Sequence, residues 1–176
     1  MIRNIQQRVI NAPAHRVGSI VEKLGSSEGS IWPSADWPRL SLDAGLAPGS
    51  GGGHGVIRYS VTEYEPRRRV RFIFAPGLGL AGYHELVITT EGLDRCRLTH
   101  TIEGTLSGRM WLLWPLVIRW LHEALTRDLL DNAERAASGQ LSRPPARWSP
   151  WVRMLRRARG LSPARATSDA APAAVR

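Results

Sequence analysis

Residues 109–138 constrain the fold most, because the chain runs from Pro115 to Gly139 without another glycine or proline. At ~1.5 Å rise per residue this stretch makes roughly 34 Å of helix, enough to cross a small domain. Gly139 is placed to end the helix, and Pro115 either kinks it or stands at its first position. One face is apolar at a helical period, so another layer must cover it. That face contains Val117, Ile118, Leu121, Leu125, Leu129 and Ala136.

The same helix carries charged residues in two settings. We expect the ion pairs Glu123–Arg127 and Asp131–Arg135 on its other face, since their members are four residues apart. Asp128 instead falls on the apolar face, within ~40° of its centre. An unpaired carboxylate there costs several kcal/mol, so Asp128 is a candidate cavity acid. The alternative is that the helix outruns its cover and Asp128 meets solvent.

Before this helix the sequence alternates with a period of two on both sides of Pro66, which predicts two strands and a turn. Closing the hairpin at Pro66 pairs Val61 with Phe72 and Tyr59 with Phe74. Register and pattern then agree, because the large apolar residues fall on one face. The inward face is expected to comprise Ile57, Tyr59, Val61, Glu63, Val70, Phe72 and Phe74.

A second hairpin is expected around Gly92, pairing Leu86 with Leu98 and therefore His84 with His100. The two Cβ atoms would be ~5 Å apart on the face turned toward the helix. Two imidazoles in an apolar cavity could orient a carbonyl or phosphate of a ligand, or act as acid and base. The alternative is that each imidazole is satisfied by backbone or water. No metal site is expected, because no third histidine or carboxylate has a spacing that forces it nearby.

The N-terminal third supplies a strand over residues 2–10 and a short helix starting near Pro13. The apolar, glycine-rich and proline-rich segment that follows is expected to fold over the body, with Trp32 and Trp37 as anchors. His54 lies in a glycine-rich stretch without the lysine and the helix of a phosphate loop, so the alternative to a plain loop is a flexible gate. The order of elements predicts an α+β fold in which a curved antiparallel sheet wraps the final long helix.

These elements resemble the SRPBCC superfamily, also called START-like or polyketide cyclase/dehydrase-like, which has the helix-grip fold. The resemblance is carried by the opening strand with NAPAHRVGSIVEKL, by GVIRYSVTEYEPRRRVRFIF and by the long helix after TIEGTLSG, and it covers residues 1–139. It implies a deep apolar cavity between sheet and helix that takes lipids, polyketides, hormones or other hydrophobic small molecules. Some members catalyse cyclisation or dehydration there and many only carry or sense. No single motif defines catalysis in the superfamily, so no catalytic residue is carried over.

Candidate site residues follow from the inward faces. We expect His84, His100 and Asp128 to be the catalytic candidates if the protein is an enzyme. The expected ligand contacts are Tyr59, Val61, Phe72, Phe74, Leu86, Leu98, Trp120, Leu121 and Leu125.

The basic character belongs to the C-terminal segment. Residues 1–139 hold 16 Lys and Arg against 14 Asp and Glu, whereas residues 140–176 hold 8 against 1. The pI of the whole chain therefore gives no reason to expect nucleic-acid binding. We expect residues 140–176 to be a basic, largely disordered tail, with a short amphipathic helix over 150–159. Residues 148–159 could dock on an anionic membrane, and the alternative is a disordered end, which fits residues 161–176.

The single cysteine, Cys96, excludes a disulfide framework, and the N-terminus lacks the apolar core of a signal peptide, so we expect a cytoplasmic protein. We favour a non-enzymatic carrier of a lipid or polyketide-like ligand. The second hypothesis is a cyclase or dehydratase using His84 and His100 for proton transfer at an enolisable carbonyl. The third is a lipid handler that visits membranes through its basic tail. No cofactor is expected.

Overall fold

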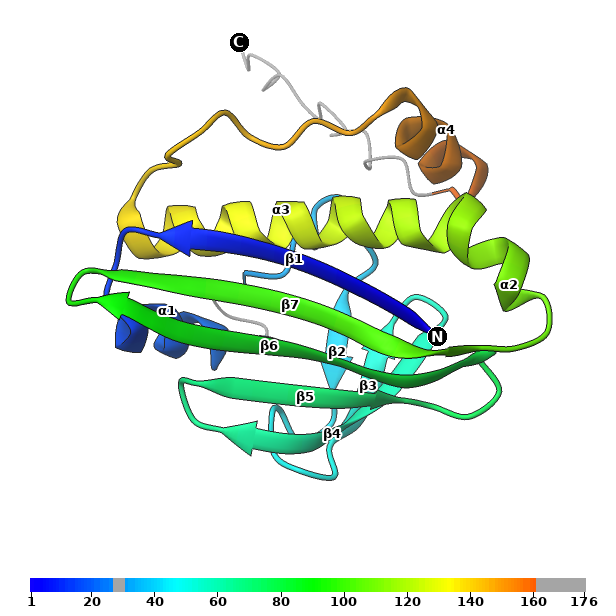
Figure 1. Ribbon diagram of the computed structural model, residues 1–176, viewed down its shortest axis with the longest axis horizontal. Coiled ribbons are helices and arrows are strands. Elements are labelled where there is room, and N and C mark those ends of the chain that lie inside the picture. Colours follow the sequence, from blue (N-terminus) through cyan, green and yellow to red (C-terminus); the bar gives the residue numbers. More distant parts are fainter. Residues whose placement is uncertain (27–30, 161–176) are drawn as a thin grey trace, which may run out of the picture.

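A seven-stranded antiparallel sheet curves around one long helix in the computed structural model, which describes residues 1–26 and 31–160 (Figure 1). The strand order is β1-β7-β6-β5-β4-β3-β2. The strands are β1 (Ile2–Ile10), β2 (Leu40–Leu42), β3 (Gly51–His54), β4 (Ile57–Glu65), β5 (Arg69–Phe74), β6 (Leu80–Gly92) and β7 (Arg95–Leu106). The helices are α1 (Ala14–Val21), α2 (Met110–Leu113), the π-helical turn η1 (Trp114–Ile118), α3 (Arg119–Ser138) and α4 (Pro150–Ala158). The predicted α+β arrangement of sheet and helix is confirmed.

The long helix forms where it was predicted, but in three pieces. Pro115 lies inside η1, because a residue without an N–H cannot continue the α-helical ladder and the turn widens around it. Gly139 ends α3 in the left-handed conformation, with φ of 80°. Leu129 is buried as predicted, but Ala136 is exposed, because α1 packs against the neighbouring stripe and buries Ala137 there instead.

The hairpin β4–β5 has the predicted register, with Val61 opposite Phe72 and Tyr59 opposite Phe74. A β-bulge between Val61 and Glu63 then inserts one extra residue into β4. Each residue beyond the bulge changes face. The prediction that Glu63 points inward is therefore wrong, and its carboxylate lies on the outer face of the sheet.

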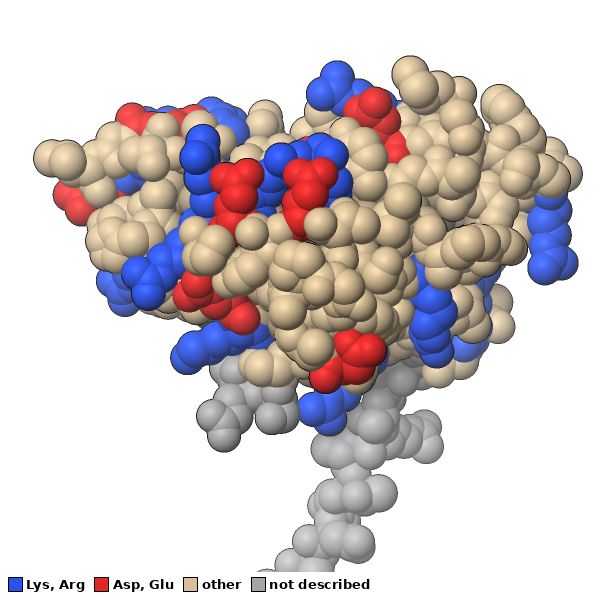
Figure 2. All heavy atoms as spheres, turned by 90° about the horizontal axis from the view of Figure 1, so that it is seen from below, with Lys and Arg blue, Asp and Glu red and all other residues tan. Residues whose placement is uncertain are grey.

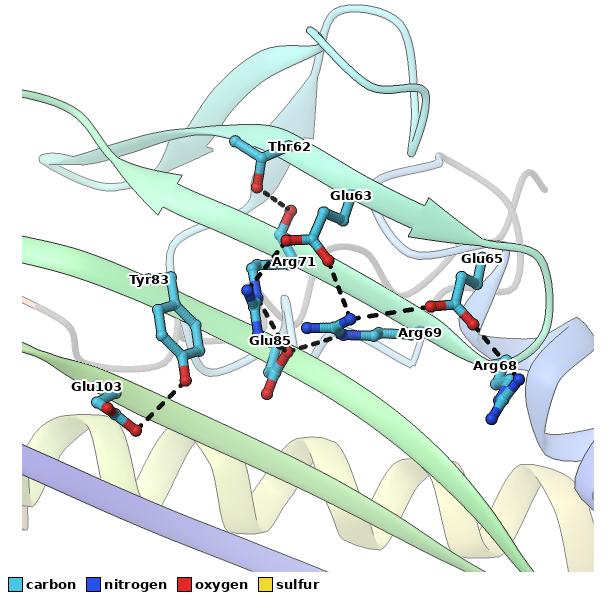
Figure 3. Close-up of polar contacts among 9 residues, drawn as sticks. All are labelled: Thr62, Glu63, Glu65, Arg68, Arg69, Arg71, Tyr83, Glu85 and Glu103. Atoms are coloured by element: carbon cyan, nitrogen blue, oxygen red, sulfur yellow. Dashed lines mark hydrogen bonds and ion pairs between the residues drawn. The ribbon is translucent and has the colours of Figure 1, made fainter.

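The outer face carries a network of ion pairs (Figure 3). Glu63 contacts Arg69 at 2.9 Å and Arg71 at 3.0 Å. Glu85 contacts the same two arginines, at 3.0 Å and 3.1 Å. Figure 2 shows acidic and basic side chains interspersed over this face. The arginines of β5 are thus matched by carboxylates and leave little free charge for an acidic partner.

The hairpin β6–β7 differs from its predicted register by two residues. Its turn lies at residues 93–94, and a bulge precedes it, so His84 lies opposite Ile102 rather than His100. The prediction that the two histidines are directly opposed is wrong. Because side chains alternate with a period of two, a two-residue shift keeps both histidines on the inner face.

Residues 31–55, which contain Trp32 and Trp37 and which we call the tryptophan segment, do fold over the body. Trp37 is buried, and the Trp32 indole donates to the carbonyl of Pro38 at 2.9 Å. The segment also contributes β2 and β3, so His54 lies at the end of a paired strand and not in a flexible gate. Glycine permits this pairing, since a Cβ on Gly52 would lie 2.0 Å from the carbonyl oxygen of Ser41.

The C-terminal segment packs back on α3 as far as residue 160. Val152 and Leu155 of α4 are buried against Leu121 and Leu125. Arg156 is 2% exposed, with its guanidinium over the rings of two tryptophans. The disorder expected for residues 161–176 lies outside the described residues. In residues 1–26 and 31–160, no helix has both the length and the apolar character needed to cross a bilayer.

A buried ionic cluster links these layers. Arg8 of β1 forms ion pairs with both Asp131 and Glu134 of α3. The remaining carboxylate oxygens accept backbone N–H groups of the C-terminal segment, from Ala146 at 2.8 Å and Ser142 at 3.0 Å. Burial alone would raise the pKa of Glu134, but the hydrogen bonds from Ser142 and Arg8 outweigh it and the pKa is lowered.

The cluster changes the ion pairs expected along α3. Glu123 does contact Arg127, at 3.5 Å, as predicted. The predicted pair Asp131–Arg135 is wrong, because Asp131 turns inward to Arg8 and is 5% exposed. A buried arginine on a neighbouring strand is a stronger partner than an exposed one on the same helix.

We expect Arg8→Met to lower the free energy of unfolding by roughly 3–5 kcal/mol, because it leaves two buried carboxylates without their cation. Arg3→Met is the matched control on the same strand, since the Arg3 side chain is 67% exposed and its pair with Glu103 is 3.6 Å long. Urea unfolding of both variants and the wild type measures the difference. Equal stability of the two variants would contradict the structural role of Arg8.

Candidate functional site

A cavity of about 270 Å³ lies between the inner face of the sheet and the helical segment η1–α3. Strands β3 to β7, the tryptophan segment and α3 all contribute to its wall. The wall is mostly apolar, with polar groups from four histidines, Tyr59, Thr126 and Arg159.

Most of the predicted ligand contacts line this cavity. Three do not. Val61 and Leu98 are 1% and 0% exposed and belong to the packed core beyond it. Trp120 is 40% exposed on the outer side of the helix, and its indole donates to the carbonyl of Pro115 at 2.8 Å. The predicted contacts that do line the cavity are Tyr59, Phe72, Phe74, Leu86, Leu121 and Leu125.

Four of the five histidines in the chain lie on the cavity wall. The ring centroids of His84 and His100 are 5.6 Å apart, so the predicted pair comes together diagonally. His122 of α3 extends it, with its centroid 4.9 Å from that of His100. His54 of β3 joins through Tyr59, whose ring is 5.9 Å from His54 and 4.6 Å from His84.

His122 is absent from the residues predicted from sequence. The helical period did contain the signal, because His122 is four residues after Ile118 and three before Leu125 and shares their face. No sequence pattern predicts that His54 lies near the other histidines, since its position depends on how β3 pairs with β4.

Aromatic contacts fix the position of His84. Its ring stacks on Phe72 at 4.7 Å with an interplanar angle of 13°, and it meets Tyr59 edge-on. Phe74 lies 5.1 Å away. Aromatic packing therefore holds the imidazole, whose Nε2 has no hydrogen-bond partner among the described residues.

Several imidazole nitrogens at the site lack a protein partner. His84 Nε2, His100 Nδ1 and His122 Nδ1 are buried and have no hydrogen-bond partner among the described residues. The other nitrogen of His122 lies 3.3 Å from the hydroxyl of Thr126. A buried polar group without a partner costs roughly 1–3 kcal/mol. A ligand hydroxyl, carbonyl or water that reaches these nitrogens would recover part of that energy.

The cavity histidines are neutral at physiological pH. Burial lowers the pKa of His100 to about 3 and that of His54 to about 4. Burial, reinforced by the neighbouring histidines, also holds the pKa values of His84 and His122 well below their usual range. Burial raises the pKa of Tyr59, so its phenol stays protonated. Each neutral imidazole presents one donor and one acceptor.

Asp128 lies away from the cavity wall. Its Oδ2 accepts hydrogen bonds from the indole N–H groups of Trp37 and Trp148, both at 2.8 Å. Burial raises the pKa of Asp128, while these two hydrogen bonds oppose the rise. Asp128, the candidate cavity acid, is therefore absent from the cavity wall, and its carboxylate instead links Trp37 and Trp148 of two distant segments to α3.

The histidines do not form a metal site by geometry. No three His, Cys, Asp or Glu side chains within the described parts of the chain are grouped so that they could share a metal ion. The cluster therefore presents separate imidazoles to the cavity.

Comparisons with known proteins bear on the fold. No protein-family model and no curated protein matches the chain. Among solved structures, CalU16 from Micromonospora echinospora is 19% identical, with a TM-score of 0.54 over 90% of this chain and 83% of that one. Norcoclaurine synthase from Thalictrum flavum, in complex with dopamine and hydroxybenzaldehyde, is 10% identical, with a TM-score of 0.59 over 81% and 90%. The chain therefore shares the helix-grip fold of these structures.

A protein from Nitrosospira multiformis is similar to the same degree, with 12% identity and a TM-score of 0.58 over 80% of this chain and 97% of that one. At such identities the helix-grip likeness concerns the path of the chain and not the chemistry of the site. The histidine cluster has to be understood from its own geometry.

The pKa of His100 predicts acid sensitivity of a definite sign. Its folded-state pKa lies below the usual 6.5, so the unfolded chain binds the proton first as the pH falls. The contribution of the neutral His100 to the free energy of unfolding is complete above pH ~6.5. Below that pH the contribution falls by about 1.4 kcal/mol per pH unit. We expect His100→Gln to lose less stability than the wild type between about pH 7 and pH 4.5.

Chemical denaturation at the two pH values measures this difference within each protein, so any loss of stability common to both pH values cancels. His15→Gln, at an exposed position of α1, is the control for removing an imidazole outside the cavity. An identical pH dependence in His100→Gln and the wild type would contradict the prediction.

Proposed function

We propose that the protein binds an uncharged hydrophobic small molecule in the cavity, with a polar group of the ligand held by the histidines. The observation that most supports this is the set of buried imidazole nitrogens without protein partners on an otherwise apolar wall. Apolar contacts would supply affinity, and the few polar groups would orient the ligand.

Charge narrows the class of ligand. With neutral histidines the wall carries one formal charge, on Arg159 at the end of α4. A carboxylate ligand would lose its hydration against a wall that is uncharged apart from Arg159. A ketone, aldehyde, phenol or alcohol loses far less and can pair with an imidazole. We therefore propose a neutral ligand.

The size of the cavity narrows the class of ligand further. The cavity volume of about 270 Å³ lies just below the range of ~300–1,000 Å³ typical of small-molecule sites. A compact ring system, such as a small polyketide-like or lipid-derived ring, fits this volume better than a long acyl chain. Norcoclaurine synthase, of the same fold, holds the small aromatic compounds dopamine and hydroxybenzaldehyde.

We place the carrier in the cytoplasm, where the buried thiol of Cys96 stays reduced.

An enzyme of cyclase or dehydratase type is the second candidate. It would use His84 and His100 for proton transfer at an enolisable carbonyl. The low pKa of His100, about 3, speaks against this at neutral pH, because general acid–base catalysis works best when the pKa is near the operating pH. Handling of lipids at a membrane, the third candidate, also needs a docking surface.

Two probes of matched size test the binding proposal. We expect 2-acetylnaphthalene, a neutral ketone, to bind at least roughly tenfold more tightly than 2-naphthoate, its carboxylate counterpart, because desolvating the charge is costly. His84→Phe keeps the ring that stacks on Phe72 but removes both nitrogens, so it should weaken ketone binding by roughly tenfold. Isothermal titration measures both differences.

N-phenyl-1-naphthylamine, a largely apolar dye, is the control ligand for His84→Phe and should bind the variant as it binds the wild type. His15→Gln is the control variant outside the cavity. Equal affinity for the ketone and the carboxylate, or an unchanged ketone affinity in His84→Phe, would show that the histidines do not select the ligand.

The same ketone separates binding from catalysis. Its methyl group is enolisable, so an enzyme with a cavity base would exchange methyl protons for deuterium in heavy water. We expect no exchange above the rate in buffer at neutral pH, as measured by proton NMR. Exchange by the wild type that is lost in His84→Gln or His100→Gln, with affinity retained, would establish the enzyme instead.

A further inference from the structure

A cluster of large apolar side chains lies exposed at one end of the molecule. Among the described residues, 11 large apolar side chains are exposed, and six of them belong to two short segments, α2 to the start of α3, and α4. Scattered exposed apolar residues are normal, but a contiguous group marks an interaction surface. We call this group the tryptophan surface, and it consists of Trp111, Leu112, Leu116, Trp120, Trp151 and Met154.

The two segments form one surface because they are joined. The indole N–H of Trp151 donates to the backbone carbonyl of Leu116 at 2.9 Å, which fixes α4 beside η1. Figure 1 shows α4 beside the start of α3, at the same end of the molecule as α2. Trp111, Leu112 and Leu116 are 59%, 69% and 57% exposed, so they contribute little to the core.

The segments that carry the tryptophan surface are basic, although the carboxylate of Asp36 contacts Arg156 of α4 at 3.8 Å. Residues 104–122 and 141–160 contain no Asp or Glu. Arg109, Arg153, Arg157 and Arg159 are exposed there, and none of them has a carboxylate partner among the described residues. The outer face of the sheet is different, since its arginines are paired with glutamates (Figure 3).

This combination suits the interface of an anionic bilayer. Tryptophan rings settle at the level of the lipid headgroups, leucine side chains reach the acyl boundary, and arginines bind lipid phosphates. A second copy of the chain is a poor occupant, because a symmetric contact would bring the same unpaired arginines face to face.

The position of this surface relates it to the cavity. Met110, Trp114 and Ile118 come from the same helical segment, but their side chains line the cavity. Arg159, just after α4, lines it as well. One side of the segment α2–η1 therefore faces the cavity while the other side is exposed.

We propose that the tryptophan surface and its arginines dock the protein on an anionic membrane, with the end of the cavity next to the lipid. The inference goes beyond ligand binding and does not depend on it. Docking requires only the exposed side chains, and the ligand requires only the cavity wall.

Co-sedimentation of the full chain with vesicles tests the proposal. We expect binding to vesicles of phosphatidylcholine mixed with phosphatidylserine, weaker binding to phosphatidylcholine alone, and a decrease at high salt. The double variants Leu112→Glu/Leu116→Glu and Arg153→Glu/Arg157→Glu should each lower the partition coefficient at least roughly tenfold. Neither pair of side chains is buried, so both variants should fold, which circular dichroism checks.

Two control variants carry single substitutions of the same two types elsewhere on the protein. Leu93→Glu alters a leucine that is 93% exposed in the β6–β7 turn, and Arg16→Glu alters an exposed arginine of α1, at the other end of the molecule (Figure 1). Both should bind vesicles as the wild type does.

Two results would overturn the proposal. One is that the wild type does not bind the anionic vesicles, or that the docking variants bind them as well as the controls do. The other is a dimer in sedimentation velocity that Leu112→Glu/Leu116→Glu dissociates, which would assign the surface to a second copy. Titration of the same variants with 2-acetylnaphthalene reports separately on the cavity, so failure of docking and failure of ligand binding are distinguishable.

Discussion

The contact of Arg8 with Asp131 and Glu134 fixes the relation between the sheet and the helix. One guanidinium from β1 forms ion pairs with two carboxylates of α3, and those carboxylates accept hydrogen bonds from the backbone N–H groups of residues 142 and 146. Three layers are thereby fastened at one end of α3. Because buried charges must stay paired, the helix cannot shift along the sheet without a large loss of energy.

Toward the N-terminal half of α3 the space between the helix and the sheet is a cavity and not a packed core, although Asn4 of β1 donates to the carboxylate of Glu123 there at 2.9 Å. The tryptophan segment closes this end through Trp37, whose indole is held by Asp128. The cavity is thus bounded by long-range contacts, while its polar character comes from histidines on three strands of the sheet and on α3. Burial keeps them neutral, so the wall can hold a neutral polar group but offers little to a charged one.

The segment α2–η1 connects the two proposed activities. The π-helical turn at Pro115 alters the helical phase, with Trp114 directed to the cavity and Leu116 to solvent beside Trp151. A ligand-binding wall and an exposed apolar surface then share one short piece of helix. This arrangement is compatible with loading of an apolar ligand from a membrane, because only the thickness of one helix separates the exposed side of α2–η1 from its cavity-facing side.

The sequence by itself determined most of the residues that face inward, with Glu63, Ala136 and Trp120 as exceptions. The alternation around Pro66 gave the register of Val61 with Phe72, and Gly139 ended the long helix. Even the wrong register of β6–β7 left His84 and His100 inside, because a shift of two residues preserves the face. Only the tertiary structure decided the partners. Periodicity specifies a direction but not what lies there, so the pairing of Asp131 with Arg8, the hydrogen bonds of Asp128 to two tryptophans and the approach of His54 depend on distant segments meeting in space.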